Sequence, residues 1–438
     1  MAKVSRYIPV RAIRVSLWNR TVGAIIPYSA GYCAFEYDPD FLLSGLDIAP
    51  LKMPLANGAG PYVFNDFGQN VFMGLPGVFA DSLPDGFGNT LISEHLRRMG
   101  VSAASITALD RLAYIGTRGI GALCYEPERG PHGGKPLALD MRKLTEEARK
   151  ALNGSLEKMS GNDALRQILR VGVSAGGGKS KAVVGWNRET NQFLAGDRDL
   201  PDGFEHWIIK FTPPEYPYRG RCEYKIMQKA RAAGIATSEC RIYELDGLEH
   251  FMTRRFDRDG QTRYHVQTLA ALAHLPTGMG SDTCSYDHIF SVIDDLRLGY
   301  ETKEQMFRRM AFNVLADESD DHTKNFSFLM RENGRWELAP AYDLNGGAPE
   351  EAEETLDPWC GWHDFHAIKI NGKQSKITDD DMLAVADRFA LGTAPRVLDE
   401  VRNVLSGTSR LASREKERSI SSSVLPFVSG SRKAAARK

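Results

Sequence analysis

The sequence predicts an α+β protein, in which a mixed N-terminal unit and a unit of short strands precede a largely helical C-terminal part. Three observations predict it. Strand-like and helical patterns mix over the first 130 residues, apolar runs flank three consecutive glycines near residue 177, and helical patterns dominate from residue 283. The 438 residues are 42% hydrophobic and 25% charged, which is an ordinary globular composition with room for two or three folding units.

Residues 1–130 form the first predicted unit. Residues 10–15 and 23–27 alternate between apolar and polar side chains, and a polar turn separates them, so the chain opens with a β-hairpin. Residues 89–99 follow a loop-rich stretch and carry helical spacing. This unit is therefore expected to be mixed α+β.

Residues 131–165 are expected to connect this unit to the next, through an amphipathic helix at 142–152 and a polar linker. The second unit, residues 166–260, opens with a strand-like run at 168–174. A glycine loop and a second strand-like run at 182–186 follow. We therefore expect a strand, a glycine turn and a strand.

Three further elements complete the second unit. Residues 206–211 read as a short apolar strand with Lys210 near its end, and residues 222–233 read as a helix. Residues 242–254 read as a hairpin through an Asp-Gly turn.

Residues 261–405 are expected to be mostly helical. The clearest helix is 303–316, and a hairpin through an Asn-Gly turn occupies 326–339. A late helix begins near residue 379 with acidic residues in its first turn, where the helix dipole favours them. Residues 406–438 are rich in Arg, Lys, Ser and Ala and are predicted to be a flexible basic tail.

Bulk properties favour a cytoplasmic protein without a membrane role. The net charge of −1 gives no overall field for nucleic acid or membrane, and no apolar run is long enough to span a bilayer or form a signal peptide core. The six cysteines are scattered, which suggests reduced thiols. Cys360, His363 and His366 do not complete a zinc set, so these histidines are interpreted as ordinary loop residues.

The segment 317–343 holds the groups that phosphoryl transfer requires. Asp320 precedes Asn325 by five residues, the offset of the kinase catalytic loop, in which the Asp accepts the hydroxyl proton and the Asn binds magnesium. A hairpin could return Asp343 as a second magnesium ligand. The offset favours Asp320 over Asp321 as the base, and the alternative is a solvated acidic loop. Two further polar residues that could face this pocket are His322 and Lys324.

The glycine loop before residue 182 invites a phosphate-binding interpretation. A P-loop would need glycine at position 173, where Val173 stands, and a strand-like run follows where a P-loop has a helix. A flap over the phosphates is the kinase arrangement, and a plain hairpin turn is the alternative. A kinase also needs a strand lysine on the phosphates and a helical glutamate to orient it. Lys210 and Glu223 occupy such positions, although a strand-end lysine and a surface glutamate would look the same.

Together these motifs resemble the HipA family, the kinase toxins of bacterial type II toxin–antitoxin systems. The resemblance extends from about residue 10 to 405. The segments that carry it are the glycine loop at 174–181, Lys210, Arg-Phe-Asp at 255–257, Asp-Asp-His-Thr-Lys-Asn at 320–325 and Ala-Pro-Ala-Tyr-Asp at 339–343.

The resemblance implies a bilobal protein-kinase-like fold and a Ser/Thr protein kinase that uses ATP and Mg²⁺. By position, Asp320 would be the general base, and Asn325 and Asp343 would hold magnesium. Ser174 matches the autophosphorylated serine of the family, and Ser180 is a second candidate; a phosphate there would repel ATP. The residues implied to bind the nucleotide are Gly176, Gly177, Gly178, Lys179, Ser180, Lys181, Lys210, Arg254, Arg255, Phe256, His322, Lys324, Asn325, Tyr342 and Asp343.

The resemblance also implies partners. The substrate would be a protein, such as an aminoacyl-tRNA synthetase and notably the glutamyl enzyme, and its phosphorylation would inhibit translation and growth. A HipB-like helix-turn-helix antitoxin would bring the complex to DNA. Two alternatives stay open: a small-molecule or lipid kinase, and a catalytically inactive module that only holds the antitoxin on DNA.

Overall fold

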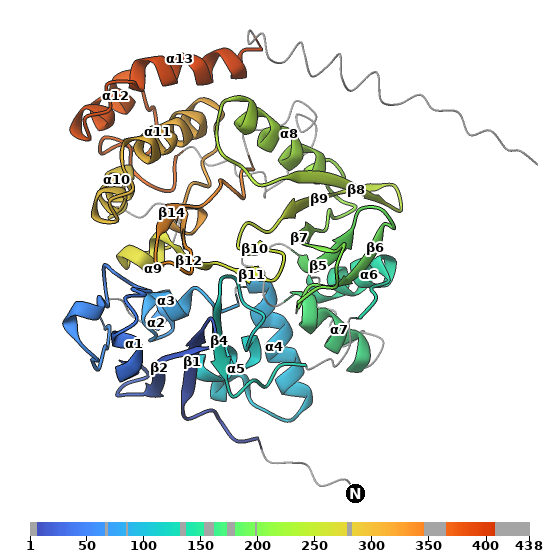
Figure 1. Ribbon diagram of the computed structural model, residues 1–438. Helices are drawn as coiled ribbons and strands as arrows, with labels where there is room; N and C mark the ends of the chain where they lie inside the picture. Colours follow the sequence, from blue (N-terminus) through green and yellow to red (C-terminus); the bar gives the residue numbers. More distant parts are fainter. Residues whose placement is uncertain are drawn as a thin grey trace, which may run out of the picture.

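The computed structural model describes residues 7–65, 69–84, 86–131, 137–152, 162–172, 180–197, 199–277, 283–345 and 365–407. Three parts are visible in Figure 1: an N-terminal unit at the bottom, a five-stranded sheet on the right and a helical part at the top left. The α+β class is confirmed. Ser174, Gly176, Gly177, Gly178, Lys179, His363, Cys360 and the tail beyond residue 407 lie outside the described residues.

The N-terminal unit is built on a four-stranded antiparallel sheet in the order β3-β2-β1-β4. Its strands are β1 (Ile13–Leu17), β2 (Arg20–Pro27), β3 (Cys33–Tyr37) and β4 (Leu123–Glu126). The opening hairpin is confirmed, and its turn residues Trp18 and Asn19 adopt positive φ angles of 48° and 61°. Ile13, Val15 and Leu17 are fully buried, because alternate residues of β1 face the core.

Seven helices and helical turns lie in the described part of this unit, of which α1 and α5 contact the sheet. The seven are α1 (Pro39–Leu42), η1 (Leu55–Asn57), α2 (Gln69–Phe72), α3 (Gly77–Ala80), α4 (Gly86–Arg98), η2 (Ala103–Ser105) and α5 (Ala108–Ile115). The helix expected at 89–99 is confirmed as α4. Helix α5 begins at a capping box, in which Thr107 and Asp110 satisfy each other's backbone N–H groups.

Two helices lead to the second unit, α6 (Met141–Leu152) and α7 (Asn162–Gly172). The amphipathic helix at 142–152 is confirmed, but the strand expected at 168–174 is wrong, because residues 168–172 form the end of α7. The β-branched Ile168 and Val171 suggested a strand, and a short apolar run cannot by itself separate a buried strand from a buried helix. The chain therefore enters the glycine loop from a helix.

The second sheet has five antiparallel strands in the order β6-β5-β7-β9-β8. Their bounds are β5 (Lys181–Asn187), β6 (Gln192–Ala195), β7 (Glu205–Lys210), β8 (Cys240–Leu245) and β9 (Leu248–Arg254). Helix α8 (Arg219–Ala232) packs against β8 and β9 (Figure 1). The strand that carries Lys210, the helix at 222–233 and the hairpin at 242–254 are all confirmed.

The remaining strands are β10 (Arg258–Asp259), β11 (Thr262–Arg263), β12 (His265–Thr268), β13 (Ser327–Met330) and β14 (Trp336–Leu338). The helices are α9 (Leu269–Ala273), α10 (Tyr286–Asp295), α11 (Tyr300–Leu315), η4 (Thr323–Asn325), α12 (Asp379–Arg388) and α13 (Ala394–Leu405). The expected helices at 303–316 and near 379 and the hairpin at 326–339 are confirmed. Strand β13 pairs with both β12 and β14, which anchors the chain directly after residue 325.

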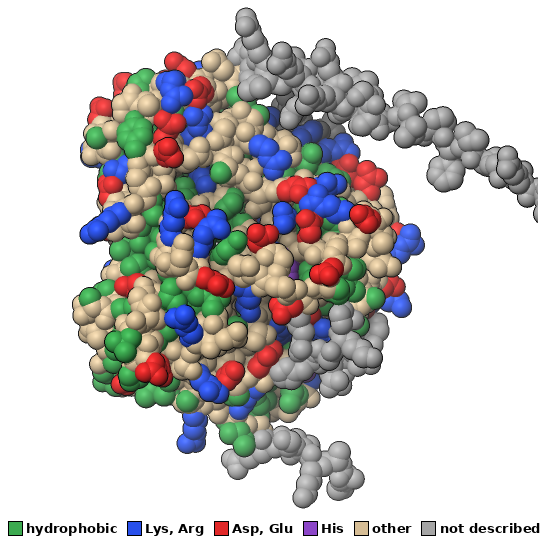
Figure 2. Space-filling model, viewed as in Figure 1, with side chains coloured by type: hydrophobic (Ala, Val, Ile, Leu, Met, Phe, Trp, Pro, Cys, Tyr) green, Lys and Arg blue, Asp and Glu red, His purple; other side chains and the backbone are tan. Residues whose placement is uncertain are grey.

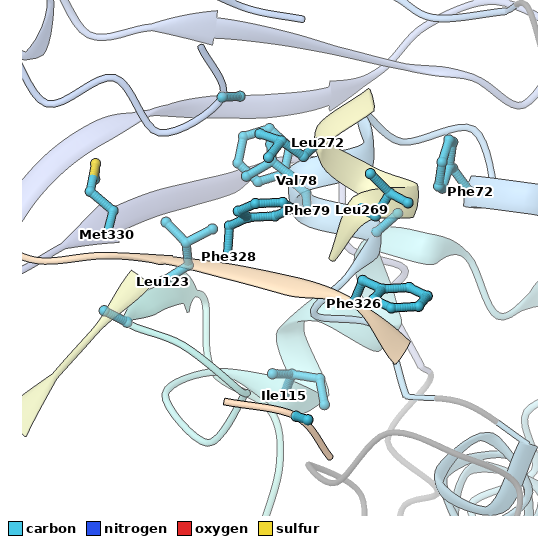
Figure 3. Close-up of a cluster of buried hydrophobic side chains, with 14 of the residues drawn as sticks. Phe72, Val78, Phe79, Ile115, Leu123, Leu269, Leu272, Phe326, Phe328 and Met330 are labelled. Atoms are coloured by element: carbon cyan, nitrogen blue, oxygen red, sulfur yellow. The ribbon is translucent and has the colours of Figure 1, made fainter. Parts of the chain in front are cut away.

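A single hydrophobic core joins the N-terminal unit to the helical part. Figure 3 shows Val78 and Phe79 of α3 beside Leu272 of α9 and Phe328 of β13, and all of these side chains belong to one buried cluster. The N-terminal unit therefore shares its core with the elements that carry residues 320–343.

The surface in view carries no single-charge region. Figure 2 shows Lys and Arg side chains interspersed with Asp and Glu, in keeping with the balanced composition. Within the described ranges, no helix is both long and apolar enough to cross a membrane. Among the residues that the structure describes, Cys33, Cys124, Cys222, Cys240 and Cys284 form no disulfide bond with one another.

Candidate functional site

The segment from Asp320 to Asn325 forms a tight loop between α11 and β13. The Asn325 side-chain amide donates a hydrogen bond to the backbone oxygen of Asp320 at 2.7 Å. The Asn325 backbone N–H bonds to the oxygen of His322 at 2.8 Å, and the buried Thr323 hydroxyl donates to the oxygen of Pro276 at 2.7 Å. The five-residue spacing therefore closes the loop on itself.

The return of the β13–β14 hairpin brings Asp343 beside this loop. Asp320, Asn325 and Asp343 line one small cavity of about 20 Å³, which has room for one water molecule or a metal ion. Asp343 adopts a positive φ of 54°. A non-glycine residue in this conformation costs roughly 1–3 kcal/mol, and such strain concentrates at functional sites.

Lys210 connects the five-stranded sheet to the cavity. Its ammonium group forms ion pairs with Glu223 on α8 and, at 2.5 Å, with Asp343. The lysine side chain is only 13% exposed. Burial disfavours its charge, but the carboxylates of Asp343 and Glu223 outweigh burial and raise the pKa of Lys210 above its ordinary value.

Asp320 and Asp321 have different surroundings. Asp321 is 2% exposed, and its carboxylate accepts hydrogen bonds from the Tyr286 hydroxyl at 2.9 Å and the Ala367 N–H at 2.8 Å. It also pairs with His366 at 3.0 Å. The side chain of Asp320 is 30% exposed and lies 3.8 Å from the imidazole of His322. Asp321 therefore anchors the loop, and Asp320 is the carboxylate that solvent or substrate can reach.

His366 is consequently more than the ordinary loop histidine that was expected. Burial alone would lower its pKa, but the hydrogen bond and charge of Asp321 raise it above the ordinary value. The signal in the sequence was weak, because 45 residues separate the two partners.

His322, Lys324 and Tyr342 lie at the rim of the loop. The imidazole Nδ1 of His322 accepts a hydrogen bond from the backbone N–H of Lys324 at 3.2 Å. The Tyr342 hydroxyl donates to the backbone oxygen of Lys324 at 2.5 Å, and the Tyr342 ring lies 5.5 Å from that of Phe256. Phe256 thus reaches the same neighbourhood from the end of the five-stranded sheet.

The two arginines before Phe256 are not brought to the cavity. The Arg255 side chain is 2% exposed and forms an ion pair with Asp257 at 2.6 Å. The Arg254 side chain pairs with Glu205 at 3.7 Å and with Asp259 at 4.0 Å. Both side chains are used in ion pairs within the protein, and nucleotide contacts by them stay a prediction.

The described end of the glycine loop leads directly into β5. Ser180 and Lys181 are 4% and 3% exposed, and the Ser180 oxygen accepts the N–H of Phe211, next to Lys210. Lys181 is the cross-strand neighbour of Lys210. The end of the loop is thus fixed to the strand that carries Lys210.

Two residues near the site escaped sequence reasoning. Asp81 of the N-terminal unit accepts hydrogen bonds from the N–H and hydroxyl of Thr268 at 2.6 and 2.8 Å, and burial raises the pKa of Asp81 to about 6. Glu318 lines the cavity and is 2% exposed. Glu318 belonged to a visible acidic run, whereas Asp81 lies 187 residues from its partner and offered no local signal.

The cavity suits a hard cation. Its lining contains four acidic side chains, Glu318, Asp320, Asp321 and Asp343, against the single basic side chain of Arg309. The Asn325 amide nitrogen is used on Asp320, so its oxygen is the atom left to bind a cation. Over the described ranges, no group of three or more His, Cys, Asp or Glu is spaced to cage a metal. Oxygen donors without a cage fit Mg²⁺, which takes its other ligands from phosphates and water.

Curated relatives match roughly a third of the chain. It is 27% identical to a putative kinase of Haemophilus influenzae over 157 residues, covering 33% of this chain and 46% of that protein. It is 27% identical to the putative kinase Y4dM of Sinorhizobium fredii over 166 residues, covering 34% and 39%. It is also 27% identical to the serine/threonine-protein kinase toxin HipA of Shewanella oneidensis over 157 residues, covering 31% and 36%. The chain spans less than half the length of each.

The fold has a solved counterpart. The chain superposes on one protein chain of a solved complex of HipA, HipB and operator DNA from Shewanella oneidensis, with a TM-score of 0.61 and 18% identity, covering 90% of this chain and 91% of that chain. The architecture is therefore HipA-like. Residues 13–126 match the HipA N-terminal domain, and residues 173–410 match the HipA-like C-terminal domain. Since the second match alone covers more than half of the chain, the protein belongs to the HipA family.

Proposed function

We propose that the protein is an ATP- and Mg²⁺-dependent serine/threonine protein kinase. One observation carries the proposal: Lys210 joins Glu223 on a helix to Asp343, which shares a cavity with Asp320 and Asn325. A kinase needs this connection, because the phosphate-binding lysine must be oriented by a glutamate and set against the metal-binding aspartate.

In this proposal each side chain has one role. Asp320 accepts the proton of the substrate hydroxyl as that oxygen attacks the γ-phosphorus of ATP; the bond from the γ-phosphorus to the β,γ-bridging oxygen breaks and ADP leaves. His322 lies 3.8 Å from the Asp320 carboxylate. Asn325 and Asp343 would hold Mg²⁺, which offsets charge on the phosphate oxygens when bound. Lys210 exchanges its bond to Asp343 for the phosphates while Glu223 keeps it oriented.

Autophosphorylation is proposed at Ser174. Of the two candidate serines, Ser180 is 4% exposed and its backbone oxygen is bonded to Phe211, so it is the poorer acceptor. A phosphate at Ser174 would bring roughly two negative charges to the loop that we expect to cover the ATP phosphates, and would thereby switch off the enzyme.

The partners are proposed by analogy with the relatives. The HipA of Shewanella oneidensis is a kinase toxin solved with HipB and operator DNA, so we propose a HipB-like helix-turn-helix antitoxin that carries this chain to DNA. The proposed substrate is a protein of the translation apparatus, such as glutamyl-tRNA synthetase, and the proposed site of action is the cytoplasm.

The test is transfer of label from [γ-³²P]ATP with Mg²⁺ to the protein itself and to purified aminoacyl-tRNA synthetases. Asp320→Asn should reduce transfer about 10²- to 10⁴-fold, the usual contribution of a general base. The matched control is Asp317→Asn, an exposed aspartate of the same acidic run, which should retain activity. Undiminished transfer by Asp320→Asn would overturn the base assignment, and label found only on a small molecule would favour a metabolite or lipid kinase.

A further inference from the structure

Glu318 occupies an unusual position between the two halves of the proposed active site. It follows α11 after Asp317, which adopts a positive φ of 51°. The Glu318 backbone N–H bonds to the Asn313 oxygen at 2.8 Å, which holds the residue against the end of the helix. Its side chain is thereby turned into the cavity, where it is almost completely buried.

The two oxygens of the Glu318 carboxylate bind two different segments. Oε1 accepts the backbone N–H of Asp320 at 3.2 Å, and Oε2 accepts the backbone N–H of Asn345. The Asn345 side chain in turn donates to the backbone oxygen of Asp343 at 3.3 Å. The Glu318 side chain therefore joins the loop that carries Asp320 to the segment that carries Asp343.

Glu318 also completes the support of Asp320. The Asp320 N–H is held by Glu318, and its carbonyl oxygen is held by the Asn325 amide at 2.7 Å. Both peptide groups that flank the proposed base are thus fixed by side chains. Bonds of this kind to a carboxylate are roughly twice as strong as bonds between neutral groups.

A buried glutamate at this place carries a cost. It adds a negative charge to a cavity that already contains Asp320 and Asp343, and burying a carboxylate without strong partners is unfavourable. A glutamine of nearly the same volume would avoid the charge, but its amide would turn a donor toward one of the two backbone N–H groups. Only a carboxylate offers an acceptor on both sides.

We propose that Glu318 is a positioning residue that fixes the spacing between Asp320 and Asp343 by accepting the backbone N–H groups of Asp320 and Asn345. It acts through the backbone and does not touch the nucleotide. We call these two hydrogen bonds the bracket. The bracket itself is a property of the fold, whereas its catalytic consequence rests on the proposed kinase function. A misplacement of about 1 Å in an active site can reduce the rate about 10²-fold, so such a bracket has catalytic value.

The variant to test is Glu318→Gln, with Glu301→Gln as the control. Glu301 is an exposed glutamate in the first turn of α11, the helix that precedes Glu318. At saturating ATP and Mg²⁺, Glu318→Gln should lower kcat about 10- to 100-fold and leave KM for ATP within about twofold. Glu301→Gln should change neither. Melting curves of both variants establish that each is folded at the assay temperature.

Two kinetic results would overturn the proposal. Recovery of kcat at high Mg²⁺ would make Glu318 a metal ligand, and an unchanged kcat for the folded fraction would make its role purely structural. Hydrogen exchange of the Asp320 and Asn345 amides, measured in the full chain, tests the bracket without any activity. Exchange should quicken in Glu318→Gln at the amide that loses its acceptor oxygen, and unchanged exchange at both amides would refute the bracket even if the wild type transfers phosphate. A wild type without transfer, with quickened exchange in the variant, would instead refute the kinase function and retain the bracket.

Discussion

Two clusters of charged residues in this protein differ in whether their charges face a cavity or bind one another. The cluster that we propose to be catalytic, called the catalytic cluster below (Asp320, Asp343, Lys210 and Glu223), borders a cavity whose charged lining residues are mostly acidic. The anchor cluster centres on Asp257, which lies between the five-stranded sheet and the N-terminal unit. A surplus of negative charge around a cavity calls for a ligand, whereas a carboxylate that is fully hydrogen-bonded within the protein holds the architecture together.

The anchor cluster is satisfied by donors from both sides of the interface. Asp257 accepts two bonds from Arg255, at 2.9 and 2.6 Å, one from Arg258 at 2.6 Å and the backbone N–H of Gly121 at 2.8 Å. Both arginines also donate to the backbone oxygen of Gly119, at 3.3 and 3.1 Å. Burial would raise the pKa of Asp257, but the two arginines hold it well below its usual range.

The comparison matters for how Phe256 is placed. This residue lies between Arg255 and Asp257, and its ring faces Tyr342 next to the catalytic cluster. The anchor therefore fixes the backbone of a proposed nucleotide-contacting residue to the N-terminal unit. The family resemblance implied a nucleotide site at residues 254–256, but the Arg255 side chain binds Asp257 and Gly119, and the Arg254 side chain pairs with Glu205 and Asp259.

The largest effect that we expect on stability comes from Asp257→Ala. Removing this carboxylate leaves Arg255 and Arg258 buried without their charge partner, which should lower the free energy of unfolding by about 3–5 kcal/mol. Chemical denaturation at neutral pH measures it. The control is Asp259→Ala in the adjacent β10, because Asp259 is 70% exposed and its ion pair with Arg254 is at the 4.0 Å limit.

The same measurement on Asp320→Asn sharpens the contrast. That variant should lose phosphate transfer and keep its stability within about 1 kcal/mol, since a partly exposed carboxylate that serves a substrate contributes little to folding. A strongly destabilised Asp320→Asn, or an Asp257→Ala protein as stable as the wild type, would break the distinction between the two clusters.

Sequence reasoning recovered what local patterns encode. The loop from Asp320 to Asn325 and the hairpin that returns Asp343 depend on spacing and turn residues within about 25 positions, and these were placed as expected. The end of α7 was misread because a buried helix terminus and a buried strand share the same apolar composition. The attachment of Arg255 to Gly119 joins positions 136 residues apart, which no local pattern specifies.

A pH experiment compares one histidine from each region. His366 supports the loop from Asp320 to Asn325. Burial opposes the charge of His366, but Asp321 raises its pKa in the folded state above the ordinary value, with Glu318 and Asp317 acting in the same direction. Its contribution to stability should therefore be complete below the ordinary histidine pKa of about 6.5 and be lost as pH rises through the folded value. His366→Gln should cost most stability near pH 5.5 and less at pH 8.5, as measured by urea unfolding at each pH.

His206, beside the anchor cluster, should give the opposite sign. Burial, with help from Arg255 and Arg258, lowers the pKa of His206 to about 3. Below about pH 6.5, His206 becomes protonated in the unfolded chain but stays neutral in the folded chain. His206 therefore disfavours folding as pH falls. Compared with the wild type at the same pH, His206→Gln should therefore gain free energy of unfolding at pH 5.5 relative to pH 8.5. Parallel pH profiles for the two variants would contradict this difference between the regions.

The smallest change in stability that we expect tests whether bond lengths or burial make the anchor cluster strong. Arg402 donates to both oxygens of Asp379 at 2.6 and 2.8 Å, so this pair resembles the Arg255–Asp257 pair in its bond lengths. Its side chains, however, are 43% and 49% exposed. Solvent already satisfies such charges in the unfolded chain, and exposed ion pairs contribute about 0–1 kcal/mol. Arg402→Ala should therefore change the free energy of unfolding by less than about 1 kcal/mol, and the change should shrink further in 1 M salt. A loss comparable to that of Asp257→Ala would mean that bond geometry, rather than burial and the N-terminal contacts, makes the anchor cluster strong.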